Sequence, residues 1–215
     1  PLVCAAMQSG KFITFEGGEG AGKTTQVGRL AERLRALGLE IVVTREPGGT
    51  PLGESVREVV LGNAPEPVTE LLLFAAARAE HVAKVIRPAL AAGTWVICDR
   101  FIDSTRVYQG LLGGVPADLI AAIEVRTVAP SYPDLTFMLD LPADVGLKRT
   151  AQRGAQTRFD AGTESFHVSL REAFRQAAAA EPERCLVLDA NREADAVAAD
   201  IWAAVEMRLF TGGNG

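Results

Sequence analysis

The chain has 215 residues, of which 48% are hydrophobic and 23% are charged, and its formal net charge is −5. This length suits one ordinary domain with a sizeable buried core. The acidic balance argues against an extended nucleic-acid surface, because phosphate backbones are bound by clustered Lys and Arg. No apolar run reaches the roughly 18 residues that span a membrane. We therefore expect no nucleic-acid partner and no membrane partner.

The N-terminal stretch and the cysteines indicate where the domain begins and in which compartment it works. Residues 1–10 (PLVCAAMQSG) are apolar but short, and we interpret them as an extension before a domain that covers residues 11–215. Cys4, Cys98 and Cys185 lie far apart and form no C-x-x-C pair. Such cysteines are typical of reduced, buried thiols, so we expect a cytoplasmic protein.

Strand-like and helix-like segments alternate along the chain. Apolar residues at helical spacing, ended by glycine, predict helices, and short β-rich runs predict strands. The strand-like runs are apolar throughout, which is typical of a parallel sheet covered on both faces. An open α/β sheet binds its ligands at the carboxyl ends of its strands. In chain order we expect a strand at 11–16, a helix at 23–37, a strand at 39–44, a long helix at 67–93, strands at 94–99, 135–141 and 184–190, and a last helix at 193–210.

The stretch FEGGEGAGKTTQ, residues 15–26, carries the strongest signal. Gly17 and Gly22, followed by Lys23 and Thr24, match the spacing G-x-x-x-x-G-K-[ST] of a loop that wraps phosphates. Backbone N–H groups and the positive end of the following helix surround the phosphate oxygens. Lys23 would bridge the outer phosphates, and the Thr24 hydroxyl would ligate Mg²⁺. The loop predicts a bound nucleoside triphosphate, but it does not identify the phosphoryl acceptor.

Two further charged segments follow predicted strands. TREPGGTPLG (44–53) places Arg45 beside a tight turn, and WVICDRF (95–101) places Asp99 and Arg100 at the end of a strand. A carboxylate there suits Mg²⁺ bound through water, and a guanidinium can fork onto a phosphate. A plain surface turn and an ordinary surface ion pair explain the same residues. The local pattern leaves both interpretations open.

The remaining candidates lie on predicted helices. In FAAAR (74–78), Phe74 and Arg78 share one helix face, as an aromatic plate and a hydrogen-bond donor for a base would, although a core Phe with a solvated Arg explains them too. STRVYQG (104–110) offers polar side chains for a base edge, or simply an exposed helix. The polar stretch 153–164 suits a mobile flap that brings arginines to a phosphoryl group, while charged helix faces are usually solvated. His81 and His167 lack metal-ligand spacing, and we assign neither a role.

Taken together, these segments closely resemble the thymidylate kinase family. FEGGEGAGKTTQ, TREPGGTPLGE, LLLFAAARAEHV, IRPALAAGTWVICDRFIDSTRVYQG and PDLTFMLDLPADVGLKR follow one another in the family's order, and the resemblance covers nearly the whole chain after residue 10. It implies a P-loop NTPase-type three-layer α/β/α fold with a five-stranded parallel sheet and a helical lid at about 149–164. It also implies transfer of the γ-phosphoryl of ATP to dTMP, Mg²⁺ as cofactor, and a homodimer.

The resemblance also implies roles for individual residues. Lys23, Asp99, Arg100, Arg153 and Arg158 would be catalytic, with Thr24 and Asp99 at the metal. Because Gly20 stands where some members carry a basic residue, the catalytic arginine is expected in the lid, with Arg153 as first candidate and Arg158 as second. ATP would be held by Gly17, Gly18, Glu19, Gly20, Ala21, Gly22, Lys23, Thr24, Thr25 and Arg149. The dTMP site would comprise Glu19, Arg45, Pro47 (in a cis peptide bond), Phe74, Arg78, Arg100, Thr105, Tyr108 and Gln109.

Two alternatives stay open at this point. Another nucleotide or nucleoside kinase of the same architecture would share the phosphate loop, although Phe74, Arg78 and Gln109 suit a pyrimidine with a carbonyl. A P-loop protein that hydrolyses ATP slowly as a switch would share it too. The chain has no Asn-Lys-x-Asp segment, which argues against a GTPase.

Overall fold

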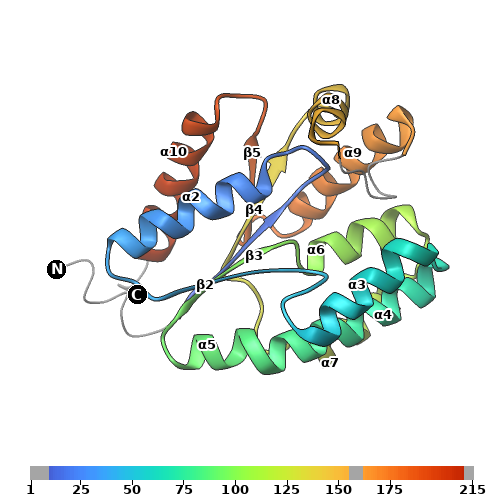
Figure 1. Cartoon of the computed structure of the whole chain (residues 1–215), viewed down its shortest axis with the longest axis horizontal. Coiled ribbons are helices and arrows are strands. Elements are labelled where there is room, and N and C mark those ends of the chain that lie inside the picture. The colour runs from blue at the N-terminus through green and yellow to red at the C-terminus, as the bar shows by residue number, and fades with distance from the viewer. Residues whose placement is uncertain (1–9, 155–161, 211–215) are drawn as a thin grey trace.

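The structure, a computed structural model, describes residues 10–154 and 162–210, apart from the side chain of Arg153. Helices and strands alternate along these residues, as the sequence predicts (Figure 1). The elements are β1 (Phe12–Glu16), α2 (Lys23–Ala36), β2 (Ile41–Arg45), α3 (Pro51–Asn63), α4 (Pro67–His81), η1 (Val82–Ile86), α5 (Arg87–Ala91), β3 (Trp95–Asp99), α6 (Ile102–Thr105), η2 (Arg106–Leu112), α7 (Ala117–Thr127), β4 (Leu135–Asp140), α8 (Ala143–Arg153), α9 (Glu164–Ala180), β5 (Cys185–Asp189), α10 (Ala194–Val205) and η3 (Glu206–Phe210).

Within the described residues, five strands form one sheet in the order β2-β3-β1-β4-β5. All four pairings are parallel. The central strand β1 pairs Phe15 with Asp99 of β3 on one side and with Phe137 of β4 on the other. The expected five-stranded parallel α/β fold is therefore confirmed. This register brings the carboxyl ends of β1 and β3, and the loops that follow them, to the same edge.

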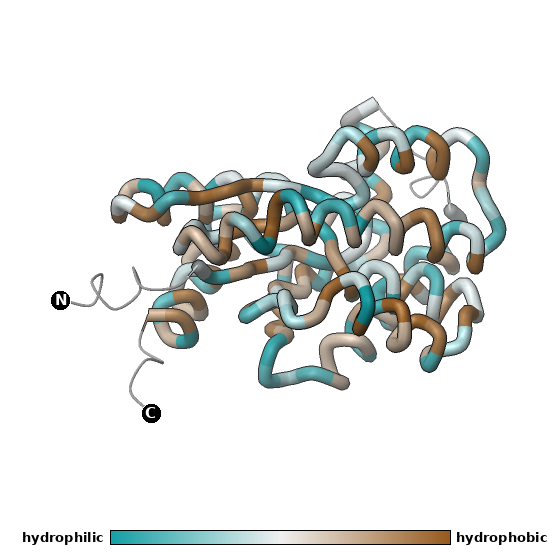
Figure 2. The backbone as a smooth tube through the Cα atoms, turned by 90° about the horizontal axis from the view of Figure 1, so that it is seen from below, coloured by the Kyte–Doolittle hydropathy of each residue, from teal (hydrophilic) through white to brown (hydrophobic). Residues whose placement is uncertain are grey.

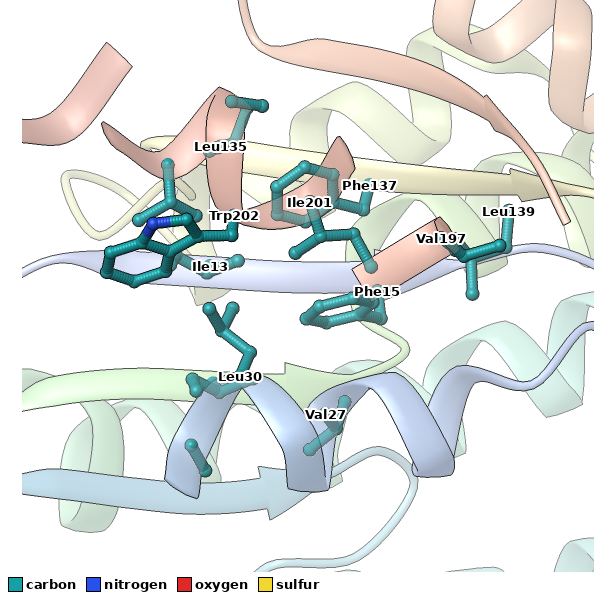
Figure 3. Close-up of a cluster of buried hydrophobic side chains, with 14 of the residues drawn as sticks. Ile13, Phe15, Val27, Leu30, Leu135, Phe137, Leu139, Val197, Ile201 and Trp202 are labelled. Carbon is teal, nitrogen blue, oxygen red and sulfur yellow. The ribbon is translucent and has the colours of Figure 1, made fainter. Parts of the chain in front are cut away.

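One face of the sheet is covered by α2 and α10. Ile13 and Phe15 of β1 point to this face, where Leu30 of α2 and Ile201 and Trp202 of α10 pack against them (Figure 3). Their side chains are almost fully buried, and each such burial contributes about 1.5–3 kcal/mol. This apolar layer anchors helix α2, and so it holds the phosphate loop in front of that helix.

The opposite face of the sheet is covered by η1 and α5 at one end and by α9 at the other. Phe12 packs with Val82, Ile86 and Phe101 on this face, and α9 covers Met138. Apolar and hydrophilic residues alternate along the helices, as expected for helices with one buried side (Figure 2). Helices lie on both faces, so the predicted three-layer α/β/α architecture is also confirmed. No helix among residues 10–154 and 162–210 is long and apolar enough to cross a membrane.

Two features differ from the sequence-based expectation. Strands β2 and β5 are not buried throughout but consist largely of partly buried and exposed residues, because they form the two edges of the sheet. The long helix expected at 67–93 and the last one expected at 193–210 are interrupted by wider π-helical turns, η1 and η3.

The expected lid at 149–164 includes the end of α8 and the start of α9, while residues 155–161 lie outside the described part.

Candidate functional site

The phosphate loop joins β1 to α2, and its glycines adopt backbone conformations that other residues rarely do. Gly17 has φ of 131°, and a Cβ there would lie 2.5 Å from the carbonyl oxygen of Leu139. Gly22, at the start of α2, has φ of 88°. Both conformations lie in the region that favours glycine. The glycine spacing read from the sequence is therefore what this turn requires sterically.

Lys23 is the first residue of α2, and its ammonium group folds back over the loop. Nζ donates to the carbonyl oxygens of Gly17 at 2.9 Å and Gly18 at 2.8 Å. Burial, with Arg100 nearby, lowers the pKa of Lys23 to about 8. A bound triphosphate would reverse this effect, since an anion favours the charged ammonium form.

Thr24 and Asp99 lie next to one another although 75 residues separate them. The Thr24 hydroxyl donates to Oδ2 of Asp99 at 2.8 Å. Asp99 ends β3, so the parallel pairing with β1 carries it to the start of α2. Hydroxyl and carboxylate oxygens are ligands that suit Mg²⁺. Among the described residues, no three or more His, Cys, Asp or Glu side chains form a group that could hold a metal ion.

Arg100 follows Asp99 and has φ of 69°, which is unusual for a residue other than glycine. Its Nη2 donates to Glu19 at 2.7 Å, and its Nη1 donates to Gly17 O and to the Ser104 hydroxyl, both at 3.2 Å. The Tyr108 hydroxyl also donates to Glu19, at 2.9 Å. Although burial works against the charge, Tyr108 and Glu19 raise the pKa of Arg100. A cation is thus held beside the phosphate loop.

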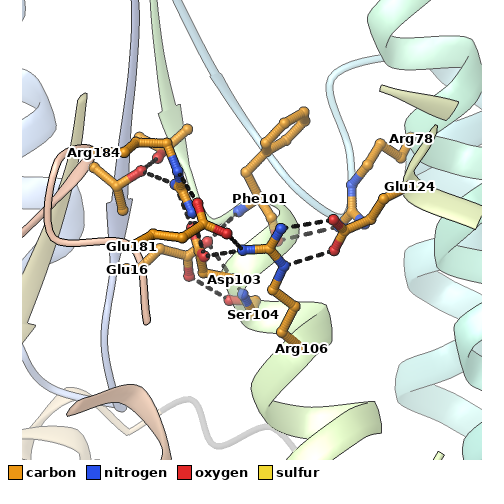
Figure 4. A network of polar contacts seen from close by, with 11 residues as sticks. Glu16, Arg78, Phe101, Asp103, Ser104, Arg106, Glu124, Glu181 and Arg184 are labelled. Carbon is orange, nitrogen blue, oxygen red and sulfur yellow. Dashed lines mark hydrogen bonds and ion pairs between the residues drawn. The ribbon is translucent and has the colours of Figure 1, made fainter. Parts of the chain in front are cut away.

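The buried carboxylate of Glu16 binds the backbone that follows Arg100, at Phe101 and Ser104 (Figure 4). Oε1 of Glu16 accepts from the backbone N–H of Phe101 at 2.7 Å and of Ser104 at 3.2 Å, and Oε2 accepts from the Ser104 hydroxyl at 2.6 Å. Burial, followed by the repulsion of Asp103, raises the pKa of Glu16 to about 7. Asp103 in turn accepts two bonds of 2.8 Å from Arg184.

Helix α4 carries an aromatic ring and a buried guanidinium four residues apart. Phe74 is partly buried, and Arg78 is only 5% exposed. Nε of Arg78 donates to Glu46 at 2.7 Å, and Nη2 donates to the Phe101 carbonyl at 3.2 Å and to Thr105 Oγ1 at 3.0 Å. The alternative of a solvated arginine is therefore wrong, because this side chain is enclosed by hydrogen-bond acceptors.

These groups surround one crevice of about 350 Å³. Its lining comes from the loop and its strand ends and from aromatic and polar residues of α4, α6 and η2. All nine residues predicted for the monophosphate site line it, together with Gly20 and the predicted catalytic and metal residues Lys23, Thr24 and Asp99. The nine are Glu19, Arg45, Pro47, Phe74, Arg78, Arg100, Thr105, Tyr108 and Gln109.

The other predicted residues lie elsewhere. Arg149 on α8 donates to the carbonyl oxygens of Gly20 at 3.4 Å and Ala190 at 3.5 Å, so it lies behind the loop. Arg153 ends α8, and its side chain is not described; Arg158 lies outside the described residues. The predicted cis peptide bond before Pro47 is confirmed. Five other residues predicted to bind ATP do not line the crevice: Gly17, Gly18, Ala21, Gly22 and Thr25. Two of them, Gly17 and Gly18, accept hydrogen bonds from Lys23.

Sequence reasoning missed several side chains of the site. His81, to which we assigned no role, is fully buried; its Nδ1 lies 2.9 Å from Glu46 Oε1 and its Nε2 lies 2.8 Å from Thr44 Oγ1. Arg57 of α3 lines the crevice, and burial and Arg45 lower its pKa. Glu16 was also missed, although it had a signal in the sequence, because it is a charged residue at the end of an apolar strand. The others have no local signature.

Comparisons with known proteins agree with this geometry. The family model described as thymidylate kinase matches residues 15–201. The thymidylate kinase of Nitrobacter winogradskyi is 53% identical over 213 residues, which is 96% of this chain and 93% of the relative. That of Caulobacter vibrioides is 52% identical and covers 94% of this chain and 99% of the relative. The crystal structure of thymidylate kinase from Ehrlichia chaffeensis matches with a TM-score of 0.74 and 36% identity, over 91% of this chain and 98% of that one.

The sequence match, the structural match and the crevice described above lead to one assignment. The chain belongs to the thymidylate kinase family, the enzymes that phosphorylate dTMP with ATP.

Proposed function

We propose that this chain transfers the γ-phosphoryl group of ATP to dTMP in a Mg²⁺-dependent, in-line reaction that gives dTDP and ADP for dTTP synthesis. The observation that carries the proposal is the single crevice lined by both Lys23 of the phosphate loop and the Phe74–Arg78 pair. A phosphoryl donor and a flat base could meet there, since the two groups of residues face one space. The monophosphate would lie between them, beside Arg45 and Arg100.

On the donor side, the amides of the loop and Lys23 would hold the triphosphate. The loop amides are already directed by glycine conformations, and α2 adds its positive N-terminal end. Arg149, which contacts the loop from α8, would pack near the adenine. This arrangement would fix the γ-phosphorus in line with the acceptor, and positioning is the main contribution such a site can make.

Thr24 and Asp99 would hold Mg²⁺. Their oxygens lie 2.8 Å apart and are hard ligands, so the donor set fits this ion, with phosphate oxygens and water as its other ligands. When bound, the ion would neutralise charge on the β- and γ-phosphate oxygens. The two residues themselves would position the donor phosphates relative to Lys23.

On the acceptor side, Phe74 would stack on the base, and Arg78 would donate to a base carbonyl. Thr105 and Gln109 would complete the base edge, while Tyr108 would lie against the deoxyribose and Glu19 near its 3′-hydroxyl. Arg45 and Arg100 would bind the phosphate. No general base is required, because the phosphate of dTMP is already an anionic nucleophile. Arg153, or failing that Arg158, would stabilise the charge on the migrating group as the lid closes.

The test is ADP release from Mg-ATP against dTMP, dUMP, dCMP, dGMP, AMP and no acceptor. We expect strong stimulation by dTMP, weaker stimulation by dUMP and none by the others. Equal release with dTMP and without an acceptor would contradict the kinase and favour a switch-like ATPase. Stimulation by a different monophosphate would favour another nucleotide kinase of this fold.

We also propose a homodimer and a cytoplasmic location. Apolar side chains of α4 and α7 are exposed, among them Leu72 at 54% and Val125 at 59%, and the two helices are in contact. A second copy packed on them would remove this apolar surface from water. Light scattering after size-exclusion chromatography tests the dimer, with Leu72→Glu expected to yield monomers. The buried thiols Cys98 and Cys185 suit a reducing compartment.

A further inference from the structure

We propose that Glu70 is a positioning residue that turns the carboxamide of Gln109 so that its carbonyl oxygen faces the base site. The site then selects pyrimidines whose ring nitrogen carries a proton, such as thymine and uracil, over cytosine. This inference rests on the proposed function and adds to it the residue that sets base selectivity.

The contact itself is short and enclosed. Nε2 of Gln109 donates to Oε1 of Glu70 at 2.5 Å. Gln109 is 2% exposed and Glu70 is 6% exposed, while Gln109 also lines the crevice. A buried hydrogen bond to a carboxylate is strong compared with one to a neutral acceptor. The amide is therefore restrained where a ligand would meet it.

The position of Glu70 on its helix suits the acceptor role that it has in the structure. It lies in the first turn of α4, which begins at Pro67, and helix N-termini stabilise negative charge. An ionised carboxylate can only accept hydrogen bonds. Consequently it selects the nitrogen of the Gln109 amide and excludes the oxygen. The oxygen, Oε1, is then the acceptor that Gln109 offers to a ligand in the crevice.

The backbone around Gln109 is held in place, so the orientation of its side-chain amide is what can change. Gln109 lies in the π-helical segment η2, and its carbonyl oxygen accepts from Val115 N at 3.0 Å. A Cβ at Gly113 would lie 2.6 Å from this same carbonyl oxygen, so the turn that follows is closely packed. With the backbone held, rotation about the end of the side chain decides whether Gln109 offers a donor or an acceptor.

Arg78 supplies a hydrogen-bond donor next to the acceptor of Gln109. Glu70, Phe74 and Arg78 are spaced by four residues and share one face of α4. The hydrogen bonds of Arg78 within the described residues use Nε and Nη2, so Nη1 remains as a donor for a ligand. Arg78 would thus donate while Gln109 accepts.

This pattern matches one pyrimidine edge and opposes the other. Thymine and uracil offer a carbonyl oxygen beside a protonated ring nitrogen, which fits a donor beside an acceptor. Cytosine offers an amino group beside an unprotonated ring nitrogen, so donor would face donor and acceptor would face acceptor. Groups left unpaired in a buried site lose affinity strongly.

Glu70→Gln tests the inference, because an amide at this position can donate to Gln109 Oε1 and permit the opposite orientation. We measure kcat/KM for dTMP and dUMP and the inhibition constant of dCMP. The preference for dTMP over dCMP should fall by about tenfold or more. The ratio of dTMP to dUMP should stay unchanged, because these bases differ only at the 5-methyl group. Glu66→Gln, an exposed carboxylate at the same helix terminus, is the matched control and should leave both ratios unchanged.

A double-mutant cycle separates positioning from a merely structural role. If Glu70 acts through the amide, Glu70→Gln should cause no further change in the dTMP-to-dCMP preference when Gln109→Ala is already present. An unchanged preference in the single variant, or equal losses for all acceptors, would overturn the inference alone. A wild-type enzyme that dTMP does not stimulate would overturn the proposed function together with it.

Discussion

Arg78 and Glu46 form a buried ion pair in the wall of the crevice, with Nε of Arg78 2.7 Å from Oε2 of Glu46 and side-chain exposures of 5% and 7%. The second oxygen of Glu46 lies 2.9 Å from Nδ1 of the fully buried His81. The last turn of α4 is thereby tied to the residue before the cis peptide bond of Pro47. The guanidinium that we propose as a base donor is therefore held by a carboxylate of the same crevice.

We first predict the effect of Glu46→Gln. Removing one charge of a buried pair leaves the other without compensation, so the free energy of unfolding should fall by about 3 kcal/mol. The KM for dTMP should rise by about tenfold, because Arg78 loses the anchor that fixes it. The KM for ATP should change little, since the hydrogen bonds of Glu46 within the described residues join it to Arg78, His81 and Asp99 and not to the phosphate loop. Denaturant unfolding and steady-state kinetics measure these effects.

An exposed ion pair gives the matched control for this variant. Arg192 and Asp200 lie 2.6 Å apart, but their side chains are 42% and 44% exposed. Asp200→Asn should therefore cost less than about 1 kcal/mol and leave both KM values unchanged. A comparable loss of stability in the two variants would contradict the role given to burial.

A second prediction concerns the pH dependence of ATP binding. The pKa of Lys23 in the free enzyme is lowered to about 8, mainly by burial and then by Arg100. Above this pH the free amine is neutral, whereas a triphosphate favours the ammonium form. ATP binding at pH 9 should therefore take up a proton, and ATP affinity should decrease as pH rises through 8. Calorimetry in two buffers of different ionisation enthalpy measures the uptake.

Lys23→Arg provides the comparison, because a guanidinium stays charged throughout this range. Its ATP affinity should be lower in absolute terms but nearly independent of pH between 7.5 and 9. Wild-type binding without proton uptake at pH 9 would show that the ammonium form persists in the free enzyme.

A third prediction concerns Glu16. Burial and then Asp103 raise its pKa from 4.5 to about 7, against the opposing effects of Ser104 and Arg100. Between these pH values the unfolded chain has released the proton and the folded chain has kept it, so the stability that Glu16 contributes is lost as pH rises. Glu16→Gln resembles the protonated form and lacks this loss. Relative to wild type, the variant should thus become more stable from pH 5 to pH 7.5, as denaturant unfolding would measure; a pH-independent difference would contradict the raised pKa.

The last prediction concerns the lid. Arg153→Ala should lower kcat by on the order of 10³, because an arginine that stabilises phosphoryl transfer acts mainly on the transition state. Its effect on dTMP binding should be within about threefold. Arg158→Ala, assayed in parallel, is the comparison variant. Unchanged turnover in Arg153→Ala would transfer the role to Arg158 or remove it from the lid.

Local pattern was sufficient to predict much of this protein. The five strands follow from short apolar runs, and the phosphate loop follows from glycine spacing, because both depend on neighbours in the chain. Family resemblance then named nine residues for the monophosphate site, and all nine line one crevice. Local pattern was insufficient to predict which strands lie at the edges of the sheet. In sequence β2 and β5 resemble inner strands, and they are exposed only because of their places in the sheet.

The sequence by itself thus determined the elements, their order and the residues that carry charge and aromatic character. Only the tertiary structure decided how those residues are oriented. Glu46 is 32 residues from Arg78, and Glu70 is 39 residues from Gln109, yet each pair shares a buried hydrogen bond. A buried polar group must find a partner, but its partner comes from whichever element packs beside it. Spacing along one loop is encoded locally, whereas the orientation of a buried guanidinium or amide depends on contacts between distant segments.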